Sequence, residues 1–130
     1  PASGSTALST AAFHDKIDIA NLLIRRGAKV ETTNRDGNTP LLVAAFMCRR
    51  KMVQLLLEKG ASPLTKNGRG ETSIDVVSSP WTKQLADIYT GIDNVVPELK
   101  FNLERIERER PQMADLLRNH VQRAKTAKEE

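Results

Sequence analysis

The 130-residue chain matches itself when it is shifted by 33 residues. Such a fixed offset indicates tandem structural units stacked along one axis, because each unit then contacts mainly its neighbours. Three units share a glycine, a threonine and an aliphatic residue near their start, and the first two also share longer segments. The matching positions are Gly4, Gly37 and Gly70; Thr6, Thr39 and Thr72; Leu8, Leu41 and Ile74; Ala11-Ala12 and Ala44-Ala45; Leu22-Leu23-Ile24 and Leu55-Leu56-Leu57; Gly27-Ala28 and Gly60-Ala61.

The middle unit predicts two short antiparallel helices. Thr39 is a candidate N-cap, and the proline after it suits the first helical position, where a missing N–H costs nothing. We expect the first helix over about 40–47 and the second over about 51–59, where Gly60 in the left-handed conformation would end it. The first unit predicts the same pair of helices, with Thr6 in the place of Thr39.

This pattern resembles the ankyrin repeat, a turn followed by two antiparallel helices at a period of 33 residues. The resemblance covers roughly residues 3–92 and is carried best by Asn38-Thr39-Pro40-Leu41 and Leu55-Leu56-Leu57-Glu58-Lys59-Gly60-Ala61. It implies an all-α solenoid with short hairpin turns. Asp15 and Cys48 depart from the family, which usually has Gly between the two helices, so a left-handed backbone there would fall on non-glycine residues.

The third unit keeps its first helix and then loses the pattern, because Pro80 cannot continue a helix interior. Residues 82–92 have apolar side chains on one helical face and predict the second helix of this last repeat. The expected boundaries are 3–35, 36–68 and 69–92 for the three repeats, within a repeat region of 1–92.

Residues 93–130 predict a helical C-terminal cap with a frayed tail. Apolar residues at helical spacing predict one helix over 98–110 and a second amphipathic helix over 112–123, with Pro111 ending the first and starting the second. The polar residues 124–130 are expected to fray. The two helices are expected to close the stack, because an open solenoid end must be covered. Binding of a partner through their apolar stripe, as in a regulatory subunit, is the alternative.

Composition excludes few classes of protein. The net charge is +4 with charges of both signs interspersed, which supports weak attraction of acidic partners and does not by itself indicate nucleic acid. The single cysteine, Cys48, excludes an internal disulfide. No run of about 18 apolar residues predicts a membrane span. The chain does not begin with Met, and its first five residues are not typical of a signal peptide, so the sequence assigns no cellular location.

Few residues could carry catalysis. Only His14 and His120 could act as bases near neutral pH. Cys48 and His14 lie about one repeat apart and could form a reactive pair, but the favoured interpretation is two surface residues at neighbouring inter-helix turns. One Cys and two distant His residues do not make a zinc site. We therefore expect no catalytic residue, no cofactor and no metal.

Two basic runs, Arg25-Arg26 and Arg49-Arg50-Lys51, raise binding of nucleic acid or another acidic partner as an alternative function. They fall at a helix C-terminus and in an inter-helix turn, and no aromatic residues lie among them to stack bases. We treat this alternative as less favoured. Its signature would be binding that weakens steeply with salt.

The family resemblance implies that a protein partner binds on the concave face, made of the hairpin tips and the exposed side of each first helix. By position, Phe13 and His14 in the first unit and Phe46 and Met47 in the second should lie side by side there. Aliphatic residues already supply the core, so Phe13 and Phe46 are surplus apolar surface. Aromatic and Met residues are enriched at interfaces. Alternatively, the two phenylalanines pack against neighbouring helices. The expected polar rim consists of Arg35, Asp36 and Asn38 on one hairpin tip and Arg69 and Glu71 on the next.

Overall fold

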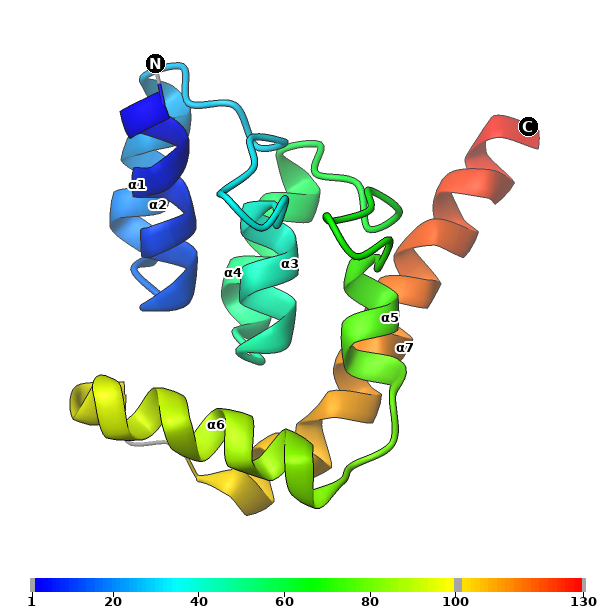
Figure 1. Cartoon of the computed structure of the whole chain (residues 1–130). Coiled ribbons are helices and arrows are strands. Elements are labelled where there is room, and N and C mark those ends of the chain that lie inside the picture. Colours follow the sequence, from blue (N-terminus) through cyan, green and yellow to red (C-terminus); the bar gives the residue numbers. More distant parts are fainter. Residues whose placement is uncertain (1, 100–101, 130) are drawn as a thin grey trace.

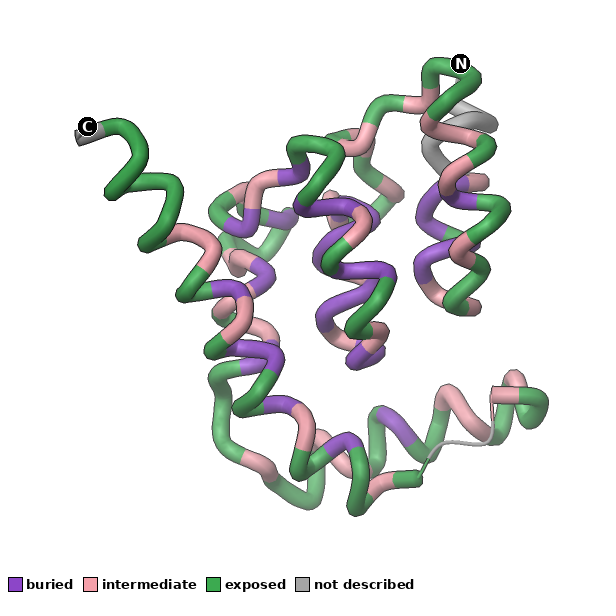
Figure 2. Tube along the Cα trace, turned by 180° about the vertical axis from the view of Figure 1, so that it is seen from behind, coloured by how far each residue is buried: buried purple, intermediate pink, exposed green. Residues whose placement is uncertain are grey.

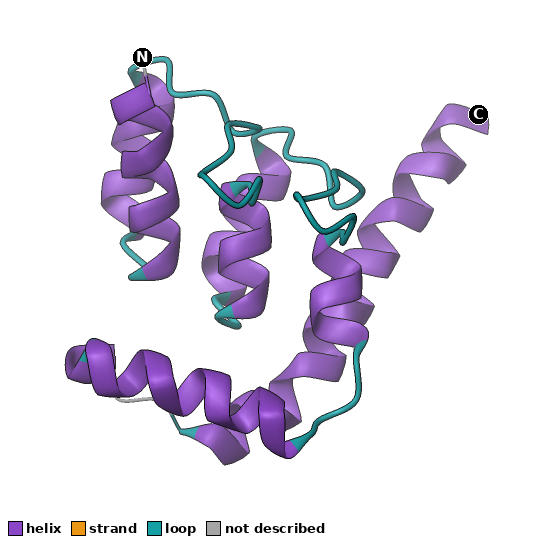
Figure 3. Ribbon diagram, in the orientation of Figure 1, coloured by secondary structure: helices purple, strands orange, loops and turns teal. Residues whose placement is uncertain are grey.

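Two antiparallel helix pairs, stacked side by side, begin the fold. In order, α1 spans Ala2–Phe13, α2 spans Ile17–Arg25, α3 spans Pro40–Phe46 and α4 spans Arg50–Glu58. The computed structural model describes residues 2–99 and 102–129, and no strand occurs among them (Figures 1 and 3). The inner helices α1 and α3 pack against each other, and α2 packs behind α1 as α4 packs behind α3. The predicted all-α solenoid of two-helix units is confirmed.

The ends of these helices follow from local hydrogen bonds. The Thr39 side chain accepts a 3.2 Å bond from the N–H of Leu42 and so caps α3, as predicted. Gly60 adopts a φ of 95° just after α4, and the N–H of Ala61 donates to the Leu56 carbonyl at 3.0 Å. This 6→1 bond is the Schellman closure of a helix, which a residue with a Cβ would strain.

One continuous aliphatic core lies between the inner and outer helices. Leu8, Leu41 and Leu56 are fully buried in it, and the paired Ala44 and Ala45 let neighbouring units approach closely. Buried positions lie along the facing sides of the helices, whereas the outer surfaces are exposed (Figure 2). The residues that recur in each repeat therefore both form the helices and provide the apolar surfaces through which neighbouring units pack.

The first helix starts earlier than predicted. It begins at Ala2, so the expected turn ending at Thr6 is absent. In the second unit the Asn34 side chain holds the equivalent turn, accepting 3.0 Å bonds from the N–H groups two and four residues further on. The residue 33 positions before Asn34 is a proline, which has no such acceptor.

The third unit departs from the predicted order of helices. Its first helix, α5 (Ser73–Ser78), starts at a capping box formed by Thr72 and Asp75. The segment expected to pair with it forms α6 (Lys83–Val95), which instead crosses below the ends of α1 and α3 (Figure 1). The outer helix behind α5 is α7 (Leu103–Glu129), after the short 3-10 helix η1 (Pro97–Leu99). The predicted pairing of residues 82–92 with the third repeat is therefore wrong.

Side-chain size explains why α7 takes the outer position. Met113, Ala114 and Leu117 enter the same core as the residues of α2 and α4. Ala114 allows α7 to approach α5 closely. The corresponding face of α6 carries the large ring of Tyr89, which packs in a separate cluster. The predicted closure of the stack by C-terminal helical residues therefore takes the form of a completed third helix pair.

Helix α7 is continuous through Pro111, so the predicted break there is wrong. Residues 124–129 are helical and residue 130 lies outside the described residues, so fraying of the tail stays a prediction. Pro111 lacks an N–H and removes the bond that the Glu107 carbonyl would accept. It lies on the exposed side of α7, where that carbonyl can be solvated, while Ala114 and neighbouring residues anchor the other side. The tail is rich in good helix formers, and its cations complement the negative end of the helix dipole.

The place of α7 in the stack predicts the effect of one core truncation. Leu117→Ala should lower the free energy of unfolding by about 2–5 kcal/mol, as Leu56→Ala should, since both side chains are fully buried in one core. Urea denaturation measures both. Gln122→Ala, on the exposed part of α7, should stay within about 0.5 kcal/mol of the parent chain. A Leu117→Ala loss as small as that of the control would show that α7 is not the outer helix of the third unit.

Candidate binding groove

A groove of about 480 Å³ lies on the inner side of the stack. Its floor is made by α3 and α5, one side by the tips of the hairpin loops and the other by α6. The floor and the α6 side are mainly apolar, whereas the hairpin side is polar. The lining includes Leu42, Val43, Phe46 and Val76 on the floor; Leu85, Ile88 and Ile92 on α6; and Asp36, Asn38, Asn67, Arg69 and Glu71 on the hairpin side.

The structure brings most of the predicted contact residues to this groove. Phe13 and Phe46 line it, as do Asp36, Asn38, Arg69 and Glu71. His14 and Arg35 lie beside it without lining it; the His14 ring meets Phe13 edge to face at 5.0 Å. Met47 borders the groove, but only 3% of it is exposed. The expectation that Met47 is free apolar surface is therefore wrong, because the C-terminal end of α3 is packed.

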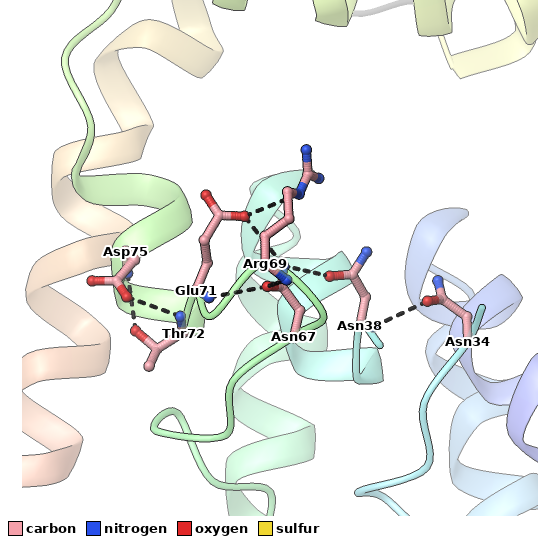
Figure 4. Close-up of polar contacts among 7 residues, drawn as sticks. All are labelled: Asn34, Asn38, Asn67, Arg69, Glu71, Thr72 and Asp75. Atoms are coloured by element: carbon pink, nitrogen blue, oxygen red, sulfur yellow. Dashed lines mark hydrogen bonds and ion pairs between the residues drawn. The ribbon is translucent and has the colours of Figure 1, made fainter. Parts of the chain in front are cut away.

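On the hairpin side, the Asn67 side chain both donates and accepts hydrogen bonds (Figure 4). The Asn67 amide nitrogen donates to Oδ1 of Asn38 on the neighbouring tip at 2.9 Å and to Glu71 at 3.2 Å. Its Oδ1 accepts from the backbone N–H groups of Arg69 and Glu71 at 2.9 and 3.0 Å. Arg69 and Glu71 also form an ion pair at 3.4 Å. Asn67 thus joins two hairpin tips, and its repeat counterpart Asn34 was a signal of this role in the sequence.

The α6 side is fixed by Tyr89, which is fully buried. Its ring stacks on Phe46 at 4.6 Å and on Trp81 at 5.9 Å, and its hydroxyl donates to the Phe46 carbonyl. Arg110 of α7 donates to the Tyr89 hydroxyl at 3.2 Å and to the carbonyl and hydroxyl of Ser79 at 3.2 and 3.0 Å. Phe46 is therefore covered on one ring face, so the prediction that it is surplus surface is only half correct.

Arg110 is a buried cation held by neutral partners. Only 2% of the residue is exposed, and among the described residues no carboxylate lies within ion-pair distance of its guanidinium. A buried charge needs its hydrogen bonds to compensate for lost hydration. The Tyr89 hydroxyl is one of these acceptors, so α6 and α7 depend on each other.

Cys48 is buried beside Tyr89 and Ile106, not at the surface as predicted. Burial raises the pKa of its thiol to about 11, although the nearby Arg110 charge lowers it in part. A protonated thiol is a poor nucleophile, so this environment opposes the reactive Cys–His pair. Burial likewise raises the pKa of Tyr89 to about 12. The expected left-handed backbone is confirmed, with φ of 58° at Asp15 and 56° at Cys48.

The basic turn after α3 has a structural role. The Arg49 guanidinium donates two bonds to the Phe13 carbonyl, at 3.3 and 3.2 Å, and so joins α1 to the start of α4. Burial lowers the pKa of Arg49. Arg50 and Lys51 are exposed beside it, whereas Arg25 and Arg26 lie at the far end of α2. The two basic runs therefore do not form one surface.

Over 2–99 and 102–129, no group of three or more His, Cys, Asp or Glu side chains could hold a metal ion. In the same ranges no helix combines the length and the apolar character that crossing a membrane requires.

Comparison with known proteins agrees with this architecture. A family model described as ankyrin repeats (3 copies) matches residues 1–67, which is just over half of the chain. The chain therefore belongs to the ankyrin-repeat family. Ankyrin repeats generally mediate protein–protein interaction and are generally non-catalytic. A search of curated proteins found no match.

The contacts of Tyr89 predict the cost of removing its hydroxyl. Tyr89→Phe leaves the stacking intact but deprives Arg110 of an acceptor, so it should lower the free energy of unfolding by about 1–3 kcal/mol. Thr90→Val, which removes an exposed hydroxyl from the same helix, should change it by less than about 0.5 kcal/mol. Urea denaturation compares the two. Equal effects would mean that the Arg110–Tyr89 bond does not hold α6.

The raised pKa of Cys48 predicts a dependence of stability on pH. The unfolded thiol ionises near its ordinary pKa of 9.0, while the native thiol ionises near 11, so stability from this group is complete below pH 9 and is lost as pH rises toward 11. Cys48→Ser lacks this contribution. Between about pH 8 and pH 11, the parent chain should lose roughly 2 kcal/mol more than the variant. Parallel losses in thermal or urea unfolding would contradict the burial of the thiol.

Proposed function

We propose that this chain is a non-catalytic protein-interaction module whose partner binds in the groove above α3 and α5. The observation that carries the proposal is one concave surface with an apolar floor and a polar border. Stable protein interfaces have this anatomy, an apolar centre from which water is excluded and a rim of polar groups. We propose Phe13, Phe46, Asp36, Asn38, Arg69 and Glu71 as contact residues, with His14 and Arg35 at the margin.

The border is suited to recognition because it is already ordered. Asn67 links the two hairpin tips, and the Arg69–Glu71 ion pair lies on one of them. The opposite side is ordered by the packing of Tyr89 on Phe46. The linked hairpin tips and the Phe46 ring are therefore held in place before a partner binds, which lowers the free-energy cost of association.

Binding of an acidic partner through the basic turns has less support. Two donors of Arg49 are occupied by the Phe13 carbonyl, which leaves Arg50 and Lys51 as the free cations of that run. Four or more separate phosphate contacts would be needed for a strong salt dependence, since each released counterion contributes about one unit of slope. A pair of neighbouring cations falls short of this.

Site-specific photo-crosslinking tests the proposed function. A photoreactive side chain in place of Arg69, which is exposed at the groove, should form a discrete covalent adduct with a protein in an extract of the source cells. The same side chain in place of Gln54, exposed on the outer helix α4, should not. The adduct should survive nuclease treatment. Adducts at both positions, or at Gln54 alone, would contradict binding in the groove.

A pair of truncations then measures the contribution of the groove. Phe13→Ala should weaken capture of that protein by about 2 kcal/mol or more, the scale of an interface hot spot. Ile19→Ala removes a comparably apolar, half-exposed side chain from α2, away from the groove, and should leave capture unchanged. Urea midpoints of both variants show whether folding has been affected.

A further inference from the structure

We propose that the partner segment in the groove is an amphipathic α-helix that lies along α6 and directs a cationic side chain to Asp36. This inference rests on the proposed function and names the kind of segment that the groove binds. It comes from three features of the described residues: the spacing of apolar residues on α6, the way α6 is held, and the unpaired charge opposite it.

The apolar stripe of α6 has the spacing of a helix-packing seam. Leu85, Ile88, Ile92 and Val95 follow one another at intervals of three, four and three residues. Side chains at such intervals form the a and d positions by which one helix packs along another. Ile88 is 51% exposed and Val95 is 81% exposed, so half of this seam is not covered by the chain itself.

Of the four seam residues, only Leu85 packs against the buried cluster that holds α6 in place. Tyr89 anchors α6 by stacking on Phe46 and by its bonds to the Phe46 carbonyl and to Arg110. Leu85 and Ile92 are half-buried, and together with Ile88 they line the groove. These three residues are therefore fixed in position and accessible from the groove, so this surface need not rearrange when a partner helix binds.

A helix fits this stripe better than an extended strand. Side chains on one face of a strand recur about every 6.6 Å, whereas the apolar residues of a helical seam recur on average about every 5 Å, so a strand loses register along α6. A helix with its own apolar residues at three and four residue intervals can interdigitate along the whole length of α6.

The charge of the groove gives the partner helix its orientation. Its charged residues are Arg69, Glu71 and Asp36, and the first two pair with each other. The Asp36 carboxylate makes no ion pair or hydrogen bond among the described residues. The groove thus carries one excess negative charge in a chain whose net charge is +4. A partner with Lys or Arg on the edge facing the hairpin tips complements it, while an acidic edge is repelled.

Two synthetic peptides of identical composition test the inference. The first has Leu and Ile at three and four residue spacing with Lys along one flank of the resulting helix, and the second has the same residues in strict alternation. Fluorescence anisotropy should show that the full chain binds the first peptide at least tenfold more tightly than the second. Circular dichroism should show that the first gains helix on mixing. Equal affinity for the two peptides would overturn the helical assignment.

Matched variants then locate the binding surface. Ile88→Ser should weaken binding of the first peptide tenfold or more, while Ile19→Ser, which alters an equally exposed isoleucine on α2, should not. Asp36→Asn should weaken it several-fold and reduce its salt dependence. Equal losses for the two isoleucine variants would overturn the role of α6, as would a concentration-dependent dimer of the parent chain that Ile88→Ser abolishes.

The failure of this inference and the failure of the proposed function give different results. If the Arg69 adduct forms but both peptides bind alike, the groove binds a protein and the occupant is not a helix along α6. If neither the adduct nor peptide binding is observed, both proposals are wrong.

Discussion

The buried bond between Arg110 and Tyr89 is the interaction on which the groove depends. It joins α7, whose other residues complete the core of the third unit, to α6, which bounds the groove. Removing a guanidinium from water is costly, and here neutral oxygens of Tyr89 and Ser79 compensate where a carboxylate is lacking. Because those acceptors come from α6 and the loop before it, this cation can be buried only when both segments are in place.

The sequence predicted the repeat units because their signals are local. A threonine cap, a proline at the first helical turn and a left-handed glycine each act within a few residues, so a 33-residue offset is enough to find them. The prediction of the third unit failed because α6 is inserted in the chain between its two helices, α5 and α7. Both α6 and α7 have an apolar stripe, but Ala114 lets α7 approach α5 closely, whereas Tyr89 of α6 packs in a separate cluster. The predicted helix break at Pro111 was wrong for a related reason. Packing of the opposite face of α7 outweighs the loss of one backbone hydrogen bond.

The groove likewise has parts that follow from the repeat, which could be predicted, and parts that depend on tertiary packing, which could not. The repeat register places Phe13, Asp36 and Arg69 correctly on the inner surface, because each unit presents the same positions there. It could not place Ile88, whose helix has no counterpart in the repeat. It also could not show that Met47 is covered, since that depends on how the end of α3 is packed. Whether these residues bind a partner stays a prediction.

The single cysteine gives this architecture an experimental use. Cys48 belongs to the buried cluster that also contains Tyr89 of α6 and Ile106 near the start of α7, and the rest of the sequence has no thiol. Only 8% of Cys48 is exposed, at the wall of a surface pocket that α7 borders, so a thiol reagent should reach it much faster when those helices separate locally from α3. If reclosing is fast compared with labelling, the rate of modification reports the population of that open form. The native chain, without any substitution, therefore carries a chemical reporter of how often one side of its groove opens.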